Sequence, residues 1–211
     1  MPGHLITIEG IGGSGKTTLV SAISKWLDAS AIPHVLTREP GGTFAGNSIR
    51  DLVLDASKSL SPWVEVLLFE ADRAETYSKV IRPALRARKI VLSDRNFYGT
   101  IAYQGFGRGL DVAEIDRIST IAMGDAYPDL IVVLDVDPQL AWQRLSHVRV
   151  GDRFDMEGLA FQHRVREGFL YAAQRDGDRA LVLDAAQDAS IVASRTFNAI
   201  SEVLAADHDP H

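Results

Sequence analysis

The stretch of the chain that decides the fold reads Leu5-Ile6-Thr7-Ile8-Glu9-Gly10-Ile11-Gly12-Gly13-Ser14-Gly15-Lys16-Thr17-Thr18. Residues 5–8 are apolar or β-branched, which favours a buried strand, and residues 10–17 fit the pattern G-x-x-x-x-G-K-[ST]. In this pattern a glycine-rich turn points backbone N–H groups at a phosphate, and the following helix adds the positive end of its dipole. The stretch therefore predicts a strand, a phosphate-binding loop and a helix in succession.

The loop indicates a nucleoside triphosphate as the ligand. Lys16 would supply a mobile cation, and the hydroxyl of Thr17 would bind Mg²⁺. The other expected contacts are Gly10, Gly12, Gly13, Ser14, Gly15 and Thr18. A glycine-rich turn without a ligand is the alternative. The chain contains neither an N/T-K-x-D motif nor an L-S-G-G-Q motif, which argues against a GTPase and a transporter-type ATPase.

Four further short apolar segments follow along the chain, and stretches with helical periodicity separate them. They cover residues 34–37, 90–93, 130–136 and 180–183. Parallel strands need long crossovers, and helices on both faces of a sheet explain why such strands are apolar on both sides. We therefore predict an α/β fold, with a five-stranded parallel sheet in a three-layer α/β/α arrangement.

Local signals also place several helices. Leu19, Val20, Ile23 and Leu27 form an apolar stripe, which predicts a helix from Lys16 to about residue 28. Other expected features are a helix start at Ser61-Pro62, a break or kink at Pro83, a cap at Asp111 and a loop over residues 104–107.

Composition limits the function. The 211 residues fit a single domain over residues 1–211, with a frayed tail over 206–211. The formal net charge of −6 opposes stable binding to nucleic acid, and the absence of cysteine excludes disulfides and thiolate metal sites. No apolar run approaches the roughly 20 residues that cross a bilayer, and the first residues lack a leader pattern. We expect a cytoplasmic protein without membrane contact.

A second anion site is expected at the carboxyl edge of the sheet, where ligands of open α/β sheets bind. Arg38 follows the second predicted strand, in the turn Thr37-Arg38-Glu39-Pro40-Gly41-Gly42-Thr43, and Arg95 follows the third. Both guanidinium groups could converge on one phosphate, or they could form surface ion pairs with Glu39 and Asp94. Asp94 is the better candidate for assisting a metal because Arg95 follows it, whereas Asp135 at the end of the fourth strand is more typical of a turn or cap.

The segment from Arg144 to Arg153 is basic within an acidic protein and lies between two predicted helices. Its composition is typical of a mobile lid, which we place at about residues 146–157. A lid of this kind brings positive charge to a phosphoryl group and excludes water. A solvated basic loop is the alternative.

Together these residues resemble bacterial thymidylate kinases, a family of P-loop nucleoside monophosphate kinases. The resemblance runs from about Leu5 to Ala185. Besides the loop and the turn above, its motifs are Leu68-Phe69-Glu70-Ala71-Asp72-Arg73-Ala74, Asp94-Arg95, Ala102-Tyr103-Gln104-Gly105-Phe106-Gly107-Arg108-Gly109, Pro128-Asp129-Leu130 and Asp152-Arg153-Phe154. The resemblance implies transfer of the γ-phosphoryl group of ATP, with Mg²⁺, to dTMP, giving dTDP and ADP. It also implies a homodimer.

For the donor side, the resemblance implies four catalytic cations, which are Lys16, Arg95, Arg149 and Arg153. Arg144 would lie against adenine. Thr17 would bind Mg²⁺ directly, while Asp94 and Glu9 would act through water.

For the acceptor side, the resemblance implies that Arg38 and Arg95 hold the phosphate. Phe69 would stack on thymine, Arg73 would hydrogen-bond the base edge, and Thr100, Gln104 and Tyr103 would line the pocket, with Tyr103 beside the sugar C2′. Phe69 and Arg73 are four residues apart on a predicted helix, so they share one face. Core packing of Phe69 and an ordinary half-buried position for Tyr103 are the alternatives.

Four residues depart from the family pattern. Gly12 replaces an acidic residue that approaches the acceptor 3′-hydroxyl, Asn96 replaces Tyr or His, Gly99 replaces Ser, and Glu70 adds a carboxylate near the base pocket. Two alternatives therefore stay open. One is a kinase for a modified or 3′-altered pyrimidine deoxynucleotide, and the other is an ATP-binding regulatory module with little catalysis.

Overall fold

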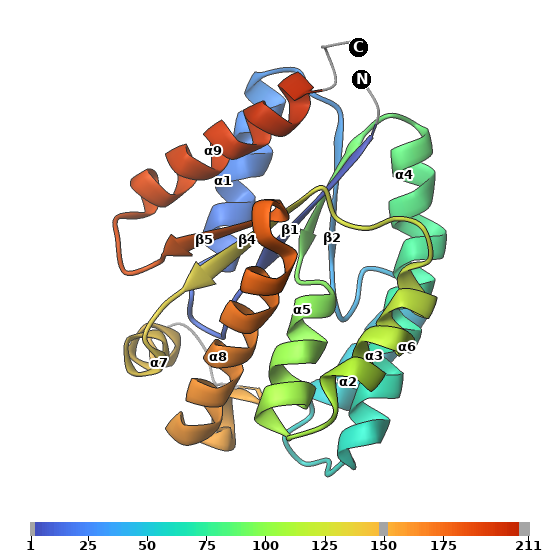
Figure 1. The fold of residues 1–211 in the computed structure, drawn as a ribbon, viewed down its shortest axis with the longest axis vertical. Coiled ribbons are helices and arrows are strands. Elements are labelled where there is room, and N and C mark those ends of the chain that lie inside the picture. The colour runs from blue at the N-terminus through green and yellow to red at the C-terminus, as the bar shows by residue number, and fades with distance from the viewer. Residues whose placement is uncertain (1–2, 148–151, 207–211) are drawn as a thin grey trace.

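Five parallel strands form one sheet in the computed structural model, which describes residues 3–147 and 152–206 (Figure 1). The strand order is β2-β3-β1-β4-β5, and every pairing is parallel. The strands are β1 (His4–Glu9), β2 (His34–Arg38), β3 (Ile90–Asp94), β4 (Leu130–Asp135) and β5 (Ala180–Asp184). Each coincides with a predicted segment to within two residues at either end, so the predicted fold class and all five strands are confirmed.

Helices cover both faces of the sheet. The α-helices are α1 (Lys16–Ala29), α2 (Phe44–Leu54), α3 (Pro62–Thr76), α4 (Arg82–Arg86), α5 (Phe97–Thr100), α6 (Val112–Met123), α7 (Pro138–Ser146), α8 (Leu159–Asp176) and α9 (Ala189–Ala206). Helices α1 and α9 pack together through Trp26 and Phe197, whose stacked rings lie 5.0 Å apart, while α8 crosses the other face (Figure 1). None of the described helices is long and apolar enough to cross a bilayer.

The strand register brings the ends of three strands together. Asp94 at the end of β3 lies opposite Ile8 of β1 on one side and opposite Arg38 of β2 on the other. The side chains of β1 are all buried, because this strand lies at the centre of the sheet. Residues that follow β1, β2 and β3 therefore share one edge of the sheet, as predicted for the site.

The helix signals are confirmed in three places. α3 begins at Pro62 after Ser61, and the side chain of Asp111 caps α6 by accepting a hydrogen bond from the backbone N–H of Ala113. Pro83 lies in the first turn of α4, and a π-helical segment (Tyr77–Ile81) precedes it. Proline lacks an N–H group and crowds the preceding turn, so the regular α-helical hydrogen bonding changes there.

The loop predicted over residues 104–107 is wrong. These residues belong to a second π-helical segment (Ile101–Gly107), which continues α5. A Cβ at Gly107 would come within 2.7 Å of the Phe161 ring on α8, and a Cβ at Gly105 within 3.0 Å of Val112. The glycines thus permit close packing of this helix instead of ending it.

Candidate active site

The phosphate-binding loop lies between β1 and α1. Gly15 precedes α1 with a φ of 98°, and Gly13 has a φ of 77°. A Cβ at Gly13 would also overlap the carbonyl oxygen of Ala141 on α7. Both positions need glycine for their backbone conformation, and the packing of Ala141 against Gly13 supports that conformation. Thr17 and Thr18 are exposed in the first turn of α1.

Two cations converge at this loop. Nζ of Lys16 donates hydrogen bonds to the carbonyl oxygens of Gly10 (3.0 Å) and Ile11 (2.8 Å), and Nη1 of Arg95 donates to the same oxygen of Gly10 (2.8 Å). Burial, together with the nearby charge of Arg95, lowers the pKa of Lys16 to about 7. An anion placed between the two cations would relieve their repulsion.

A strained backbone turn directs Arg95 to this position. Arg95 has a φ of 75°, which is uncommon for a residue with a side chain, and its N–H donates to the carbonyl oxygen of Ile8 (3.0 Å). Its Nη2 donates to the hydroxyl of Tyr103 (3.3 Å), and its guanidinium lies 5.2 Å from the centre of that ring. Arg95 therefore joins the phosphate-binding loop to the cavity beside Phe69, which is described below.

Arg38 lies close to a third arginine. Nε of Arg38 and Cδ of Arg50 lie 3.1 Å and 3.5 Å from the position that a Cβ at Gly41 would take. Arg50 is partly buried and donates to the carbonyl oxygen of Pro40 (2.8 Å); burial lowers its pKa, and the charge of Arg38 adds to this. Within the described residues Arg38 forms no ion pair. Sequence reasoning missed Arg50, whose only signal was its place on the helix after the Gly41-Gly42-Thr43 turn.

Asn96 organises the buried carboxylates beneath this edge. Its backbone N–H donates to Oε1 of Glu9 (2.8 Å), and its side chain caps α5 and donates to Glu39 (3.4 Å). Burial raises the pKa values of Glu9 and Glu39 to about 8 each. Oε2 of Glu9 is buried without a hydrogen-bond partner among the described residues.

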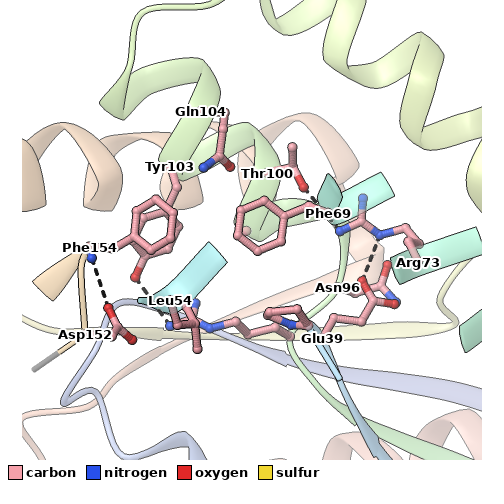
Figure 2. Close-up of a pocket in the computed structure, with 13 residues that line it drawn as sticks. Glu39, Leu54, Phe69, Arg73, Asn96, Thr100, Tyr103, Gln104, Asp152 and Phe154 are labelled. Atoms are coloured by element: carbon pink, nitrogen blue, oxygen red, sulfur yellow. Dashed lines mark hydrogen bonds and ion pairs between the residues drawn. The ribbon is translucent and has the colours of Figure 1, made fainter. Parts of the chain in front are cut away.

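Arg95 also lines an open cavity, and Figure 2 shows the residues around it. The predicted residues Phe69, Arg73, Thr100, Tyr103 and Gln104 line it together with Arg95, and further lining residues include Leu54, Asn96, Gly99, Asp152 and Phe154. The half-buried ring of Phe69 faces this space, with the Phe154 ring 6.0 Å away, so Phe69 is not simply a core residue. The aromatic rings of Phe69, Tyr103 and Phe154 form part of its lining, which suits an aromatic base.

Arg73 is held rigidly on the polar wall. Its Nε donates to Glu39 (2.8 Å), its Nη1 to Glu70, and its Nη2 to the hydroxyl of Thr100 (3.2 Å). Burial opposes its charge, but the carboxylates of Glu70 and Glu39 outweigh this and raise the pKa of Arg73. Glu39 thus pairs with Arg73 and not with Arg38. Glu70 lies behind Arg73, where it also accepts from Ser119 (2.8 Å), and it does not line the cavity.

One arginine of the predicted lid, Arg153, lies close to the cavity. Arg153 donates to the carboxylate of Glu65 on α3 (2.9 Å) and to the carbonyl oxygen of Val53 (3.1 Å). These bonds hold its guanidinium beside the acceptor cavity, so its catalytic role stays a prediction. Arg149 lies outside the described residues. Glu65 also accepts from Gln104, and sequence reasoning missed it although it precedes Phe69 by one helical turn.

The space beside Gly12 is filled by a carboxylate from another segment. A Cβ at Gly12 would overlap Oδ1 of Asp155, in the short 3₁₀ helix Asp155–Glu157. Asp155 is buried, and its other oxygen accepts from the backbone N–H of Asp152 (3.0 Å). The P-loop therefore lacks its own acid, but a neighbouring acid occupies the adjoining space.

A second broad cavity borders the other side of the loop. Ser14, Gly15, Thr18 and Arg144 line it, and Arg144 donates to the carbonyl oxygen of Ala185 (2.7 Å). This bond holds the guanidinium at the cavity wall, where a flat base could stack on it.

Oxygen donors suited to Mg²⁺ lie around the end of β1. They are the exposed hydroxyl of Thr17, the half-buried carboxylate of Asp94 and the oxygen of Glu9 that has no partner in the described part of the chain. Mg²⁺ prefers oxygen ligands and keeps several waters, so these donors fit it. In residues 3–147 and 152–206 no group of three or more acidic or histidine side chains could hold a metal by itself. Asp135 instead binds Arg166 through both oxygens (2.6 and 2.9 Å).

A phosphate-binding loop on a parallel sheet, with one cavity lined by Arg95 and another lined by Arg144, defines the class of P-loop nucleotide kinases. A model of the thymidylate kinase family matches residues 8–195. Thymidylate kinase from Pelotomaculum thermopropionicum is 40% identical over 206 residues, which cover 97% of this chain and 95% of that relative. The chain belongs to the thymidylate kinase family and is a nucleoside monophosphate kinase.

Other relatives agree. Thymidylate kinase from Gloeobacter violaceus is 42% identical over 201 residues, covering 94% of this chain and 95% of that protein. The crystal structure of thymidylate kinase from Ehrlichia chaffeensis is similar with a TM-score of 0.77 at 34% identity, covering 95% of this chain and 99% of that one.

Proposed function

We propose that this chain transfers the γ-phosphoryl group of MgATP to dTMP by in-line displacement, between the cations of Lys16 and Arg95. Phosphorylation of dTMP to dTDP is the activity that the family membership supports, and the alternatives of an altered pyrimidine substrate or a non-catalytic ATP-binding module are not favoured. The observation that carries the proposal is the shared hydrogen bond of Lys16 and Arg95 to the carbonyl oxygen of Gly10. Positive charge fixed at this point would stabilise the migrating phosphoryl group.

On the donor side, the loop from Gly10 to Thr18 would hold the phosphates of ATP, and Arg144 would stack on adenine. When ATP binds, Lys16 would exchange its two carbonyl partners for phosphate oxygens. Thr17 would bind Mg²⁺ directly, with Asp94 and Glu9 acting through water. Bound Mg²⁺ would neutralise charge on the donor phosphates.

On the acceptor side, Arg38 and Arg95 would hold the dTMP phosphate, with Arg50 adding positive charge. Phe69 would stack on thymine, Arg73 would donate a hydrogen bond to its edge, and Tyr103 would lie beside the sugar C2′. No general base is required, because a phosphate monoester is already largely ionised near neutral pH.

The lid and the assembly complete the proposal. The lid at about residues 146–157 would supply Arg149 and Arg153 as further cations. We place the enzyme in the cytoplasm as a homodimer, acting through one domain over residues 1–211. The exposed apolar side chains Val64 and Leu67 on α3 and Ile121 on α6 suit a contact between two copies. Light scattering tests the dimer, and a monomeric mass at micromolar concentration would overturn it.

The function is tested by incubating the purified chain with MgATP and dTMP, dUMP, UMP, dCMP or dGMP in turn, with ADP and the nucleoside diphosphate measured as products. We expect dTMP to be turned over with the highest kcat/KM. ATP binding without ADP release across the panel would contradict the proposal.

A further inference from the structure

The carboxylate of Glu65 is buried behind Gln104, which lines the acceptor cavity. Glu65 is fully buried on α3, and Gln104 on the π-helical segment Ile101–Gly107 is only 1% exposed. Oε2 of Glu65 accepts a hydrogen bond from Nε2 of Gln104 at 2.9 Å. Two elements far apart in the sequence are thus joined at the cavity by one side-chain hydrogen bond.

The charge of Glu65 is matched by two guanidinium groups. Arg108 donates from Nε and Nη2, each at 3.3 Å, and Arg153 donates from Nη1 at 2.9 Å. A carboxylate paired with two cations has only acceptor oxygens to offer. The amide of Gln104 must therefore turn its NH₂ group toward Glu65 and its oxygen away from it.

In this orientation the side-chain oxygen of Gln104 is left for a ligand. Oε1 is buried and has no hydrogen-bond partner among the described residues, and Gln104 lines the acceptor cavity above Phe69 (Figure 2). A buried carbonyl oxygen without a partner costs stability, and a donor on the ligand removes that cost.

A donor lies on the same wall. Arg73 has five N–H groups and donates to Glu39, Glu70 and Thr100, which leaves N–H capacity on its two terminal nitrogens. The wall thus offers one fixed acceptor and one fixed donor. A pyrimidine with a ring N–H beside a carbonyl, as in thymine and uracil, matches this pair, whereas cytosine presents the reverse pattern.

We propose that Glu65 is a positioning residue that sets base selectivity by fixing the orientation of the Gln104 amide. The inference rests on the proposed function, which places the base of the acceptor nucleotide in this cavity. Glu65 touches no substrate itself. Glu65 makes Gln104 an obligatory acceptor. A base that presents an acceptor atom to the Gln104 oxygen therefore leaves two acceptors facing each other.

The test compares kcat/KM for dTMP and dCMP in the wild-type chain, Glu65→Gln and a matched control, Glu157→Gln. Glu157 also pairs with Arg108 (2.5 Å) but is not a partner of Gln104. A glutamine at position 65 can donate as well as accept, so the Gln104 amide becomes free to turn over. We expect the dTMP-to-dCMP ratio of kcat/KM to fall at least about tenfold in Glu65→Gln, mainly through KM for dTMP. In Glu157→Gln the ratio should stay unchanged.

A merely structural role of Glu65 would lower kcat/KM for both nucleotides alike, and an unchanged ratio would overturn the inference. In a Gln104→Leu background, Glu65→Gln should not change the ratio further, whereas a further fall would also overturn it. A wild-type chain that does not phosphorylate dTMP would instead contradict the proposed function.

A measurement on the wild-type chain keeps the inference testable if Glu65→Gln does not fold. The side-chain ¹⁵NH₂ signals of Gln104 can be assigned by their loss in Gln104→Leu. We expect their exchange with water to be slow both without and with dTMP, because the NH₂ group binds Glu65 in both states. Fast exchange in the free protein, or protection that appears only with dTMP, would overturn the inference.

Discussion

Replacing Gly12 with Ala should slow catalysis by displacing the segment that carries Asp155. Gly12 lies outside the left-handed region, so the backbone accepts alanine there. The added Cβ would approach Oδ1 of Asp155 about 1 Å closer than the 3.4 Å at which ordinary contact begins. The neighbouring residues Asp152 and Phe154 line the acceptor cavity, so a retreat of Asp155 would shift that wall. Misplacement by about 1 Å can cost on the order of 100-fold in rate.

Steady-state turnover of ATP and dTMP measures this effect, with thermal unfolding as the control for folding. We expect Gly12→Ala to lower kcat by about 10- to 100-fold, and the double variant Gly12→Ala/Asp155→Ala to recover most of that loss, because it removes the overlapping carboxylate. Wild-type turnover by Gly12→Ala, or a double variant as slow as the single one, would refute the reasoning.

Three further predictions concern the buried charges. Lys16→Met should lose most turnover in the steady-state assay and keep a wild-type melting temperature, and near-normal activity would refute the role of Lys16. Burial lowers the pKa of Lys16 to about 7, so Lys16 is mostly neutral at pH 8 and should take up about 0.9 proton when ATP binds. Calorimetry in buffers of different ionisation enthalpy measures this uptake, and Lys16→Met should take up none. Burial raises the pKa of Glu9 from 4.5 to about 8, so its contribution to stability is complete below pH 4.5 and is lost as the pH rises to about 8. In urea unfolding, the stability of wild type relative to Glu9→Gln should therefore fall between pH 5.5 and 7.5, by at most about 1.4 kcal/mol per pH unit, and a constant difference would show that Glu9 does not titrate there.

The parts of the molecule that local patterns determine could be predicted from the sequence. The strands and the phosphate-binding loop depend on runs of adjacent residues, such as 5–18, and all five strands are confirmed. The spacing of Phe69 and Arg73 likewise places both on one helix face, and both line the same cavity.

The parts that depend on packing between distant segments could not be predicted. Composition alone made residues 104–107 a loop, because the contact of Gly107 with Phe161 is not visible in the sequence. The ion pair of Glu39 with Arg73 joins residues 34 positions apart, and the approach of Asp155 to Gly12 joins two loops. The contact of Glu70 with Arg73 and the approach of Asp155 to Gly12 each change how a departure from the family pattern is interpreted. Glu70 serves to hold Arg73, and the space beside Gly12 is already occupied by an acid.

Binding of a bisubstrate analogue, with ATP and dTMP joined through their phosphates, shows whether two anions meet at Lys16 and Arg95. Calorimetry with the wild-type chain should give a Kd at least about 100-fold below that of ATP or dTMP alone, since joining the ligands makes the second binding event intramolecular. Arg95→Gln should lose most of this gain. An analogue that binds wild type no more tightly than ATP would contradict the bridging geometry and, with it, the proposed transfer.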